Sequence, residues 1–446
     1  MEGLRVTEPM RALRGRVLSF GPPPQPGAAD VPHRFLDDGV ILLRDGRIER
    51  VEAAATLLPD LPPGTPVDHY PDALILPGLI DPHIHYPQTR VVGAHGTQLL
   101  EWLHRYTFPE EAKLRDPDYA AVCARFFLDE LLRQGTTTAA VYCTVHPQSV
   151  DAFFAESARR NTRMIAGKVM MDRNAPDDLR DTAEAGARES AALLAAWHGR
   201  GRQLYAVTPR FAVTSTEAQL DAAAGLLRDH PGVYLQTHLA ENHAEIATVR
   251  AQFPAARSYT DVYARHGLLG PRSLFGHCLH LDDADVALLG ESGSVAVFCP
   301  TSNLFLGSGL FDMARLRGAA APVPVAIATD IGGGTSYSML RTAAEGYKVL
   351  QMQGQTWPPL AAFRQITRGN AEALSLDDRI GAIEPGFEAD FAVLDPRATP
   401  AMAQRLDRDG SDLVDELSVL LTLGDDRCVR ATYVAGVRVA GVGQDR

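Results

Sequence analysis

Short apolar runs alternate with longer amphipathic segments along most of this chain, and this alternation constrains the fold more than any other feature. Eight runs rich in β-branched or apolar residues are each followed by a helical stretch or a loop. They are LILPGLIDPHIH, TTTAAVYCT, MIAGKVMMD, LYAVTPRF, VYLQTHLAE, SLFGHCLHL, SVAVFCPTSN and PVAIATDIGG. Strands that alternate with helices form parallel sheets, and eight such strands close a barrel. We therefore predict an α/β fold with a TIM (β/α)8 barrel over residues 77–370.

The two ends of the chain show a different pattern, one of short strands and turn residues. RALRGRVLSF and GVILLRDGRIERVEA are typical of strands, and Asp45-Gly46 in the second run is a hairpin signal. After Asn370, RIGAIEPGFEADFAVLD and VRATYVAGVRVAG return to the strand pattern. We predict that residues 1–76 and 371–446 pair to form a small β domain flanking the barrel. The length of 446 residues suits a barrel of roughly 250 to 300 residues with such an addition.

Charge and composition narrow the class of partner. The net charge of -12, without a run of Lys and Arg, argues against a nucleic-acid binder and favours a small-molecule substrate. The N-terminal residues have no signal-peptide pattern, and no run reaches about 18 apolar residues. We expect a cytoplasmic protein that does not enter a membrane. The five cysteines contain no C-x-x-C pair, so we expect buried, reduced thiols.

Polar residues gather where the predicted strands end. His83 and His85 share one face of the first strand because alternate residues of a strand point the same way. His238, His277 and Asp330 end later strands, and the chemistry of a barrel belongs at these ends. Three imidazoles, of His83, His85 and His238, and the Asp330 carboxylate make an open site for one Zn²⁺ per chain. Such an ion lowers the pKa of bound water towards about 7, and Asp330 or His277 can accept the released proton.

Longer stretches of the sequence resemble a known family. The order H-x-H, H, H, D at the ends of strands one, five, six and eight resembles the amidohydrolase superfamily, and the flanking text resembles the guanine deaminases within it. The matching segments are PGLIDPHIHYPQT, QLLEWLHRYTFPEE, GKVMMDRN, TPRFAVTST, QTHLAEN, GHCLHL, CPTSNLFLGSG and ATDIGGGTSYSML. HYPQT and TPRFAVTST are much more specific than H-x-H. The resemblance implies a homodimeric zinc enzyme of guanine catabolism that converts guanine to xanthine and ammonia.

The resemblance also implies a role for individual residues. It makes four side chains metal ligands: His83, His85, His238 and Asp330. It assigns catalytic roles to Glu241 as the acid that protonates the ring, to His277 as the group that positions the hydroxide, and to Asp330 as the group that returns a proton. Four residues become guanine contacts or pocket walls: Gln88, Trp102, Arg210 and Phe211.

Elementary chemistry agrees with these roles. Attack at carbon 2 of a purine breaks the aromaticity of the ring, so a neighbouring ring nitrogen must gain a proton. Glu241 can supply that proton if its pKa is raised. Arg210 has only donors, which match the carbonyl oxygen of guanine and not the amine of adenine, so we expect adenine to be rejected. Gln88 can present either end of its amide and therefore decides little by itself.

Several alternatives stay open at this point. A related deaminase that acts on 8-oxoguanine or a triazine would carry the same ligands. A metal-free scaffold is the non-enzyme alternative, although such a protein has no chemical reason to keep a costly polar cluster. Binuclear relatives bridge two metals with a lysine that ends strand four, where this chain has Arg210, so we expect one metal and a structural role for Lys168. Asn303 either orients a ligand or substrate, or only packs.

Overall fold

The computed structural model describes residues 10–22, 31–95 and 98–441. The outermost parts of the predicted flanking domain, residues 1–9 and 442–446, lie outside the described residues. The chain divides into two compact units. The first comprises Met1–Ile80, Leu131–Thr137 and Pro358–Arg446, and the second comprises Asp81–Glu130 and Thr138–Trp357. These divisions, after Ile80 and after Trp357, fall near the predicted domain boundaries after residues 76 and 370.

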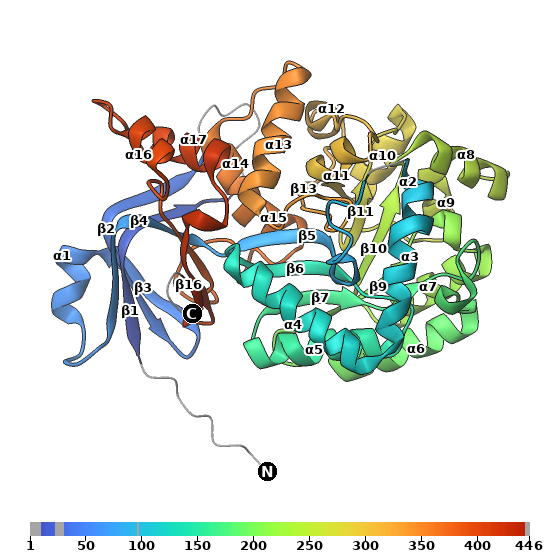
Figure 1. Ribbon diagram of the computed structural model, residues 1–446, viewed down its shortest axis with the longest axis horizontal. Coiled ribbons are helices and arrows are strands. Elements are labelled where there is room, and N and C mark those ends of the chain that lie inside the picture. The colour runs from blue at the N-terminus through green and yellow to red at the C-terminus, as the bar shows by residue number, and fades with distance from the viewer. Residues whose placement is uncertain (1–9, 23–30, 96–97, 442–446) are drawn as a thin grey trace, which may run out of the picture. The chain divides into compact units, whose positions relative to one another are not determined.

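All eight predicted barrel strands are present, and they stand side by side in chain order (Figure 1). The strands are β5 (Leu79–His85), β6 (Thr136–Tyr142), β7 (Arg163–Gly167), β9 (Leu204–Pro209), β10 (Tyr234–Leu239), β11 (Ser273–His277), β12 (Val295–Phe298) and β13 (Val325–Ile327). A two-residue strand, β8 (Val169–Met170), pairs with β9. This order confirms the predicted TIM barrel.

The residues that follow β13 close the barrel onto β5. The Asp330 N–H donates to the His83 carbonyl at 3.0 Å, and the His85 N–H donates to the Ile331 carbonyl at 2.7 Å. The two segments that carry the H-x-H motif and the predicted aspartate ligand are therefore hydrogen-bonded directly to each other.

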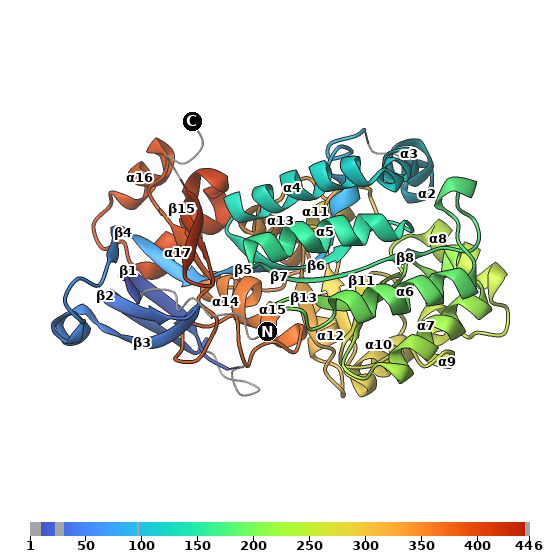
Figure 2. The same cartoon turned by 90° about the horizontal axis from the view of Figure 1, so that it is seen from below.

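Helices surround the barrel strands (Figure 2). The longer ones are α4 (Pro117–Arg133), α5 (Pro147–Arg160), α6 (Ala183–Trp197), α7 (Glu217–Asp229), α8 (His243–Gln252), α9 (Tyr259–Arg265), α10 (Asp283–Ser292) and α13 (Met339–Met352). Side-chain caps fix several of their starts: Asn242 and Asp282 form capping boxes at α8 and α10, which satisfy backbone N–H groups that a helix end leaves free. Within the described residues, no helix has the length and apolar character needed to span a membrane.

The first unit contains a seven-stranded sheet built from both chain ends. Its order is β16-β15-β14-β4-β1-β2-β3. The strands are β1 (Arg11–Phe20), β2 (His33–Arg44), β3 (Arg47–Ala53), β4 (Val67–Pro77), β14 (Phe391–Leu394), β15 (Val429–Val434) and β16 (Val437–Gly441). Antiparallel pairing of β14 with β4 joins the two ends of the chain and confirms the predicted small β domain. The hairpin at Asp45-Gly46 is also confirmed, since both residues have positive φ, 50° and 74°.

Two details differ from the sequence prediction. The run LILPGLIDPHIH is not one strand, because it breaks at Gly78, between β4 and β5. A Cβ on Gly78 would stand 2.1 Å from Oγ1 of Thr137, so this close approach requires glycine. Helix α14 (Pro359–Arg364) ends just before Asn370, and the region from Asn370 onward holds three helices that the strand pattern did not indicate: α15 (Asn370–Ala373), α16 (Pro400–Leu406) and α17 (Leu413–Leu423).

Candidate active site

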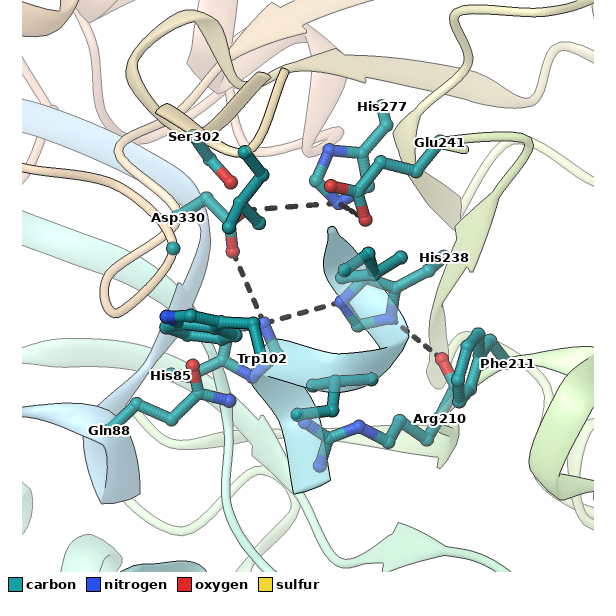
Figure 3. A pocket seen from close by; sticks show the side chains of 14 residues that line it. His85, Gln88, Trp102, Arg210, Phe211, His238, Glu241, His277, Ser302 and Asp330 are labelled. Atoms are coloured by element: carbon teal, nitrogen blue, oxygen red, sulfur yellow. Dashed lines mark hydrogen bonds and ion pairs between the residues drawn. The ribbon is translucent and has the colours of Figure 1, made fainter. Parts of the chain in front are cut away.

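The predicted metal ligands meet where the barrel strands end, and Figure 3 shows three of them, His85, His238 and Asp330. The Nε2 atoms of His83 and His85 each lie 3.3 Å from Oδ1 of Asp330. Nε2 of His238 lies 3.3 Å from Nε2 of His85. His83, His85 and Asp330 are buried, and His238 is partly exposed towards a pocket that it lines. Side chains from β5, from β10 and from the residues after β13 therefore converge on one point.

The backbone is strained where these strands end. Four non-glycine residues there have positive φ: Ala240 (51°), His277 (74°), Cys278 (54°) and Asp330 (53°). Such conformations cost on the order of 1–3 kcal/mol each and cluster at functional sites. Hydrogen bonds to neighbouring strands hold them, as when the Cys278 N–H donates to the Leu239 carbonyl at 2.9 Å. The surrounding barrel, and not local preference, thus sets the direction of the His277 and Asp330 side chains.

The nitrogen atoms of the cluster suit a cation. Nδ1–H of His238 donates to the Arg210 carbonyl at 2.7 Å, which leaves its Nε2 lone pair facing the cluster. Neither ring nitrogen of His83 makes an aligned hydrogen bond to a described residue. Burial lowers the pKa of His85 to about 3, and burial together with the neighbouring histidines lowers the pKa of His238, so both rings are neutral. Buried nitrogens without partners are rare, and a bound metal ion would satisfy these.

Asp330 supplies the negative charge of the cluster. Burial by itself would raise its pKa, but contacts with His83 and His85 hold the pKa well below its ordinary value. An ionised carboxylate beside three imidazoles is a donor set that zinc prefers. Cys299 lies near the ligand atoms of His83, His277 and Asp330; burial raises the pKa of its thiol, and its Sγ lies 3.6 Å from the Val297 carbonyl. Cys299 and the other four cysteines are buried and free, as predicted.

Glu241 and His277 form a second pair beside the cluster. Nε2 of His277 lies 3.3 Å from Oε2 of Glu241 and 3.8 Å from Oδ2 of Asp330. Nδ1–H of His277 donates to Oδ1 of Asn303 at 2.9 Å, so Asn303 orients this ring. Burial, and the nearby charge of Asp330, raise the pKa of Glu241 to about 8, while the Ser308 hydroxyl donates to its Oε1 at 2.9 Å. At neutral pH the Glu241 side chain is mostly protonated and can serve as an acid.

A pocket opens onto these groups. The short helix α2 (Leu99–Trp102) and the π-helical turn after it, η3 (Leu103–Thr107), contribute to one wall. All four predicted substrate contacts line the pocket: Gln88, Trp102, Arg210 and Phe211. Apolar walls with a few converging polar groups are what a small planar ligand requires.

The sequence prediction missed Glu111, a residue of helix α3 (Phe108–Glu111). Its Oε2 accepts from Nη1 of Arg210 at 2.7 Å, and its Oε1 accepts from Nε2 of Gln88 at 2.8 Å. Glu111 lies inside the segment QLLEWLHRYTFPEE, but an acid in a charged stretch ordinarily indicates a solvated helix face. Its exposed fraction of only 1% distinguishes Glu111 from such a solvated acid, and this is visible only in the structure.

Two other expectations can be compared with the structure. The structural role expected for Lys168 is confirmed: its side chain is fully buried, bonded to Asp181 and 3.5 Å from Glu189. The expectation that Gln88 can present either end of its amide is wrong. Its Oε1 accepts from the Gly332 N–H at 3.2 Å while its Nε2 donates to Glu111, so one orientation is fixed.

Comparison with known proteins assigns the class of this chain. The amidohydrolase family pattern matches residues 74–439, so the chain belongs to the amidohydrolase family. Among individual relatives, it is 49% identical to a guanine deaminase of Escherichia coli (strain K12) over 403 residues, which is 90% of this chain and 91% of the relative. A solved E. coli guanine deaminase matches it with a TM-score of 0.94 at 46% identity, covering 97% of this chain and all of that one (100%).

Two more distant structures bear on the ligands of the site. A guanine deaminase from C. acetobutylicum with guanine bound in its active site has a TM-score of 0.84 at 27% identity, with 97% of this chain and 100% of that chain covered. An adenosine deaminase from Xanthomonas campestris with bound zinc has a TM-score of 0.82 at 25% identity, with 97% and 94% covered.

Gly276, on β11, gives a test of the metal cluster. An added Cβ there would stand 2.5 Å from Cε1 and 3.0 Å from Nδ1 of His83. Gly276→Ala should therefore displace this ring, lower the bound metal content and reduce stability by about 1–3 kcal/mol. Elemental analysis and thermal unfolding measure both effects.

Gly270→Ala is the matched control, because its Cβ would meet nothing closer than Oγ of Ser273 at 3.9 Å. If Gly276→Ala retains as much metal as this control, His83 is not a ligand in the way the geometry indicates.

Proposed function

We propose that this enzyme hydrolyses guanine to xanthine and ammonia, with one zinc ion held by His83, His85, His238 and Asp330. The observation that carries the proposal is a single pocket in which this cluster, the protonated Glu241 and the Arg210 guanidinium all face the same space. The guanine deaminases among its relatives, one of them with guanine bound, support the choice of substrate. The relative with bound zinc supports the choice of metal.

The residues of the site divide the proton transfers between them. A zinc ion held by His83, His85, His238 and Asp330 would supply the nucleophile, because it would lower the pKa of a bound water. Asp330, whose Oδ2 lies 3.8 Å from Nε2 of His277, would take up the proton that the water gives away, and His277 would position the nucleophile. Glu241 passes its proton to the ring nitrogen next to carbon 2 as that carbon is attacked. Asp330 then returns its proton to the amine, the proton of the added hydroxyl group passes to the Glu241 carboxylate, the C–N bond breaks, and ammonia leaves as the carbonyl of xanthine forms.

Arg210 supports guanine over adenine. A guanidinium has only donors, and guanine carries an acceptor at carbon 6 where adenine carries an amine. Because Arg210 is 2% exposed, adenine would leave a buried donor facing another donor. Negative charge that develops on the ring during attack strengthens the bond to Arg210, so part of its contribution falls on the maximal rate. The homodimer, the cytoplasmic location and the role in guanine catabolism that the family resemblance implies remain part of this proposal.

An ammonia-release screen with guanine, 8-oxoguanine, adenine, cytosine and guanosine tests the substrate. We expect guanine to give the highest kcat/KM and adenine to release no ammonia, because adenine has no amine at carbon 2 and would also present a donor to Arg210. Faster turnover of 8-oxoguanine than of guanine would replace the proposed substrate. No release from any of the five would remove the assignment as a purine deaminase.

We expect close to one zinc per chain, because one such cluster is present among the described residues and Arg210, not lysine, follows strand β9. His238→Ala should empty the site, since it removes the imidazole whose Nε2 faces His85. Two tightly bound metals in the wild type, or full zinc in His238→Ala, would show that the ligand assignment is wrong. Elemental analysis of the purified proteins measures the zinc content of each.

Glu241→Gln should keep zinc and lower kcat by at least about 10²-fold, since an amide has nearly the same shape but cannot deliver the proton. Glu291→Gln, at an exposed position of α10, serves as the control and should retain wild-type turnover. Near-normal kcat in zinc-loaded Glu241→Gln would assign the acid role to another group.

A further inference from the structure

The two polar side chains that the family resemblance makes guanine contacts, Gln88 and Arg210, share one buried carboxylate, that of Glu111. The two oxygens of the Glu111 carboxylate are divided between them, with Oε1 on Gln88 and Oε2 on Arg210. The Arg210 and Glu111 side chains are 3% and 1% exposed. Glu111 does not line the pocket, whereas Gln88 and Arg210 do. The carboxylate thus stands behind the recognition groups and acts on a ligand only through them.

The carboxylate determines which end of the Gln88 amide faces Arg210. A carboxylate only accepts hydrogen bonds, so Nε2 of Gln88 must point at Glu111. Because the two oxygens of one carboxylate are adjacent, Nε2 of Gln88 and Nη1 of Arg210 are held next to each other. The Gly332 N–H holds Oε1 of Gln88 on the other side. The result is a continuous edge of N–H donors.

Arg210 is restrained in a second direction by the same helix. Its guanidinium lies over the ring of Phe108, 5.4 Å from the centroid, and Phe108 and Glu111 are the first and last residues of α3. The cation is therefore held by an acceptor in its plane and an aromatic face beside it. A planar guanidinium that is held in this way presents its remaining N–H groups to a ligand in one fixed direction.

We propose that Glu111 is a positioning residue that sets specificity, because it turns Gln88 and Arg210 into a paired donor edge for the O6 and N7 acceptors of guanine. This inference rests on the proposed function. It adds that the choice of substrate depends on the Glu111 carboxylate, which does not itself contact the substrate.

The experiment compares two substrates that share the amine at carbon 2 and N7 but differ at carbon 6 and, as a consequence, at the hydrogen on N1. 2-Aminopurine has the same amine at carbon 2 and the same N7 as guanine, but hydrogen in place of O6. We expect Glu111→Gln to lower kcat/KM for guanine by about 10²-fold, the loss that misplacing binding groups by about 1 Å can cause. The value for 2-aminopurine should change far less, so that the guanine to 2-aminopurine ratio falls.

The neighbouring acid is a matched control. Glu110 is also a buried glutamate of α3, but its carboxylate binds Lys113 and Tyr119 and none of the groups lining the pocket. Glu110→Gln should leave the substrate ratio at the wild-type value. Zinc content and Tm of each variant show whether the barrel and the metal cluster are intact.

Glu111→Asp is the second variant, because Glu111→Gln leaves the buried Arg210 without its counter-charge and can impair folding. Aspartate keeps the charge but is one methylene shorter, so it cannot hold both partners at their present distances, and we expect an intermediate ratio. In a Gln88→Ala background the effect of Glu111→Asp should shrink, since one of the two groups through which it acts is gone.

Two results would count against the inference. A zinc-loaded, folded Glu111 variant with the wild-type ratio overturns it, whether the two kcat/KM values stay unchanged or fall by the same factor. Absence of guanine turnover in the wild type overturns the proposed function, and this inference with it, and is recognised before any variant is made.

Discussion

The hydrogen bonds that join β5 to the residues after β13 are the constraint on which the site depends. They connect the first barrel strand to the last, so residues almost 250 positions apart become neighbours. The Thr329 N–H donates to Oδ1 of Asp81 at 3.1 Å, which places a buried carboxylate directly beneath this junction. Burial raises the pKa of Asp81 to about 7. Without this closure, His83 and His85 would not lie beside Asp330, and these side chains could not bind one metal ion together.

Burial then gives the groups at this junction different protonation states. It penalises charge on every one of them, so His85 and Glu241 both favour the neutral form, with pKa values of about 3 and about 8. Asp330 escapes this tendency because the imidazoles beside it favour its anion. One environment thereby yields neutral ligands, an anionic ligand and a protonated acid. Pairs of groups whose pKa values are pushed apart are a general means of dividing acid and base roles at neutral pH.

The sequence predicted those parts of the molecule that depend on periodicity or on strand ends. The eight barrel strands and the convergence of His83, His238 and Asp330 follow from where apolar runs stop, and a barrel permits few other arrangements. The break at Gly78 was not predictable, because it depends on the approach of Thr137, a residue distant in sequence. Glu111 was missed for a related reason: local sequence cannot distinguish a solvated helix acid from one that binds two side chains in the interior.

The Glu111–Arg210 pair is difficult to explain as a source of stability alone. Removing two charges from water costs several kcal/mol for each ion, and apolar residues of similar volume often stabilise a fold as well or better. Glu111, however, binds Gln88 as well as Arg210, and an apolar pair could not fix the direction of an amide. The short helix α3 that supplies Glu111 follows closely on α2, which supplies the pocket wall residue Trp102. The α2–α3 segment therefore shapes the pocket with one residue and orients its donors with another, so a change in this segment alters substrate choice without touching the metal cluster.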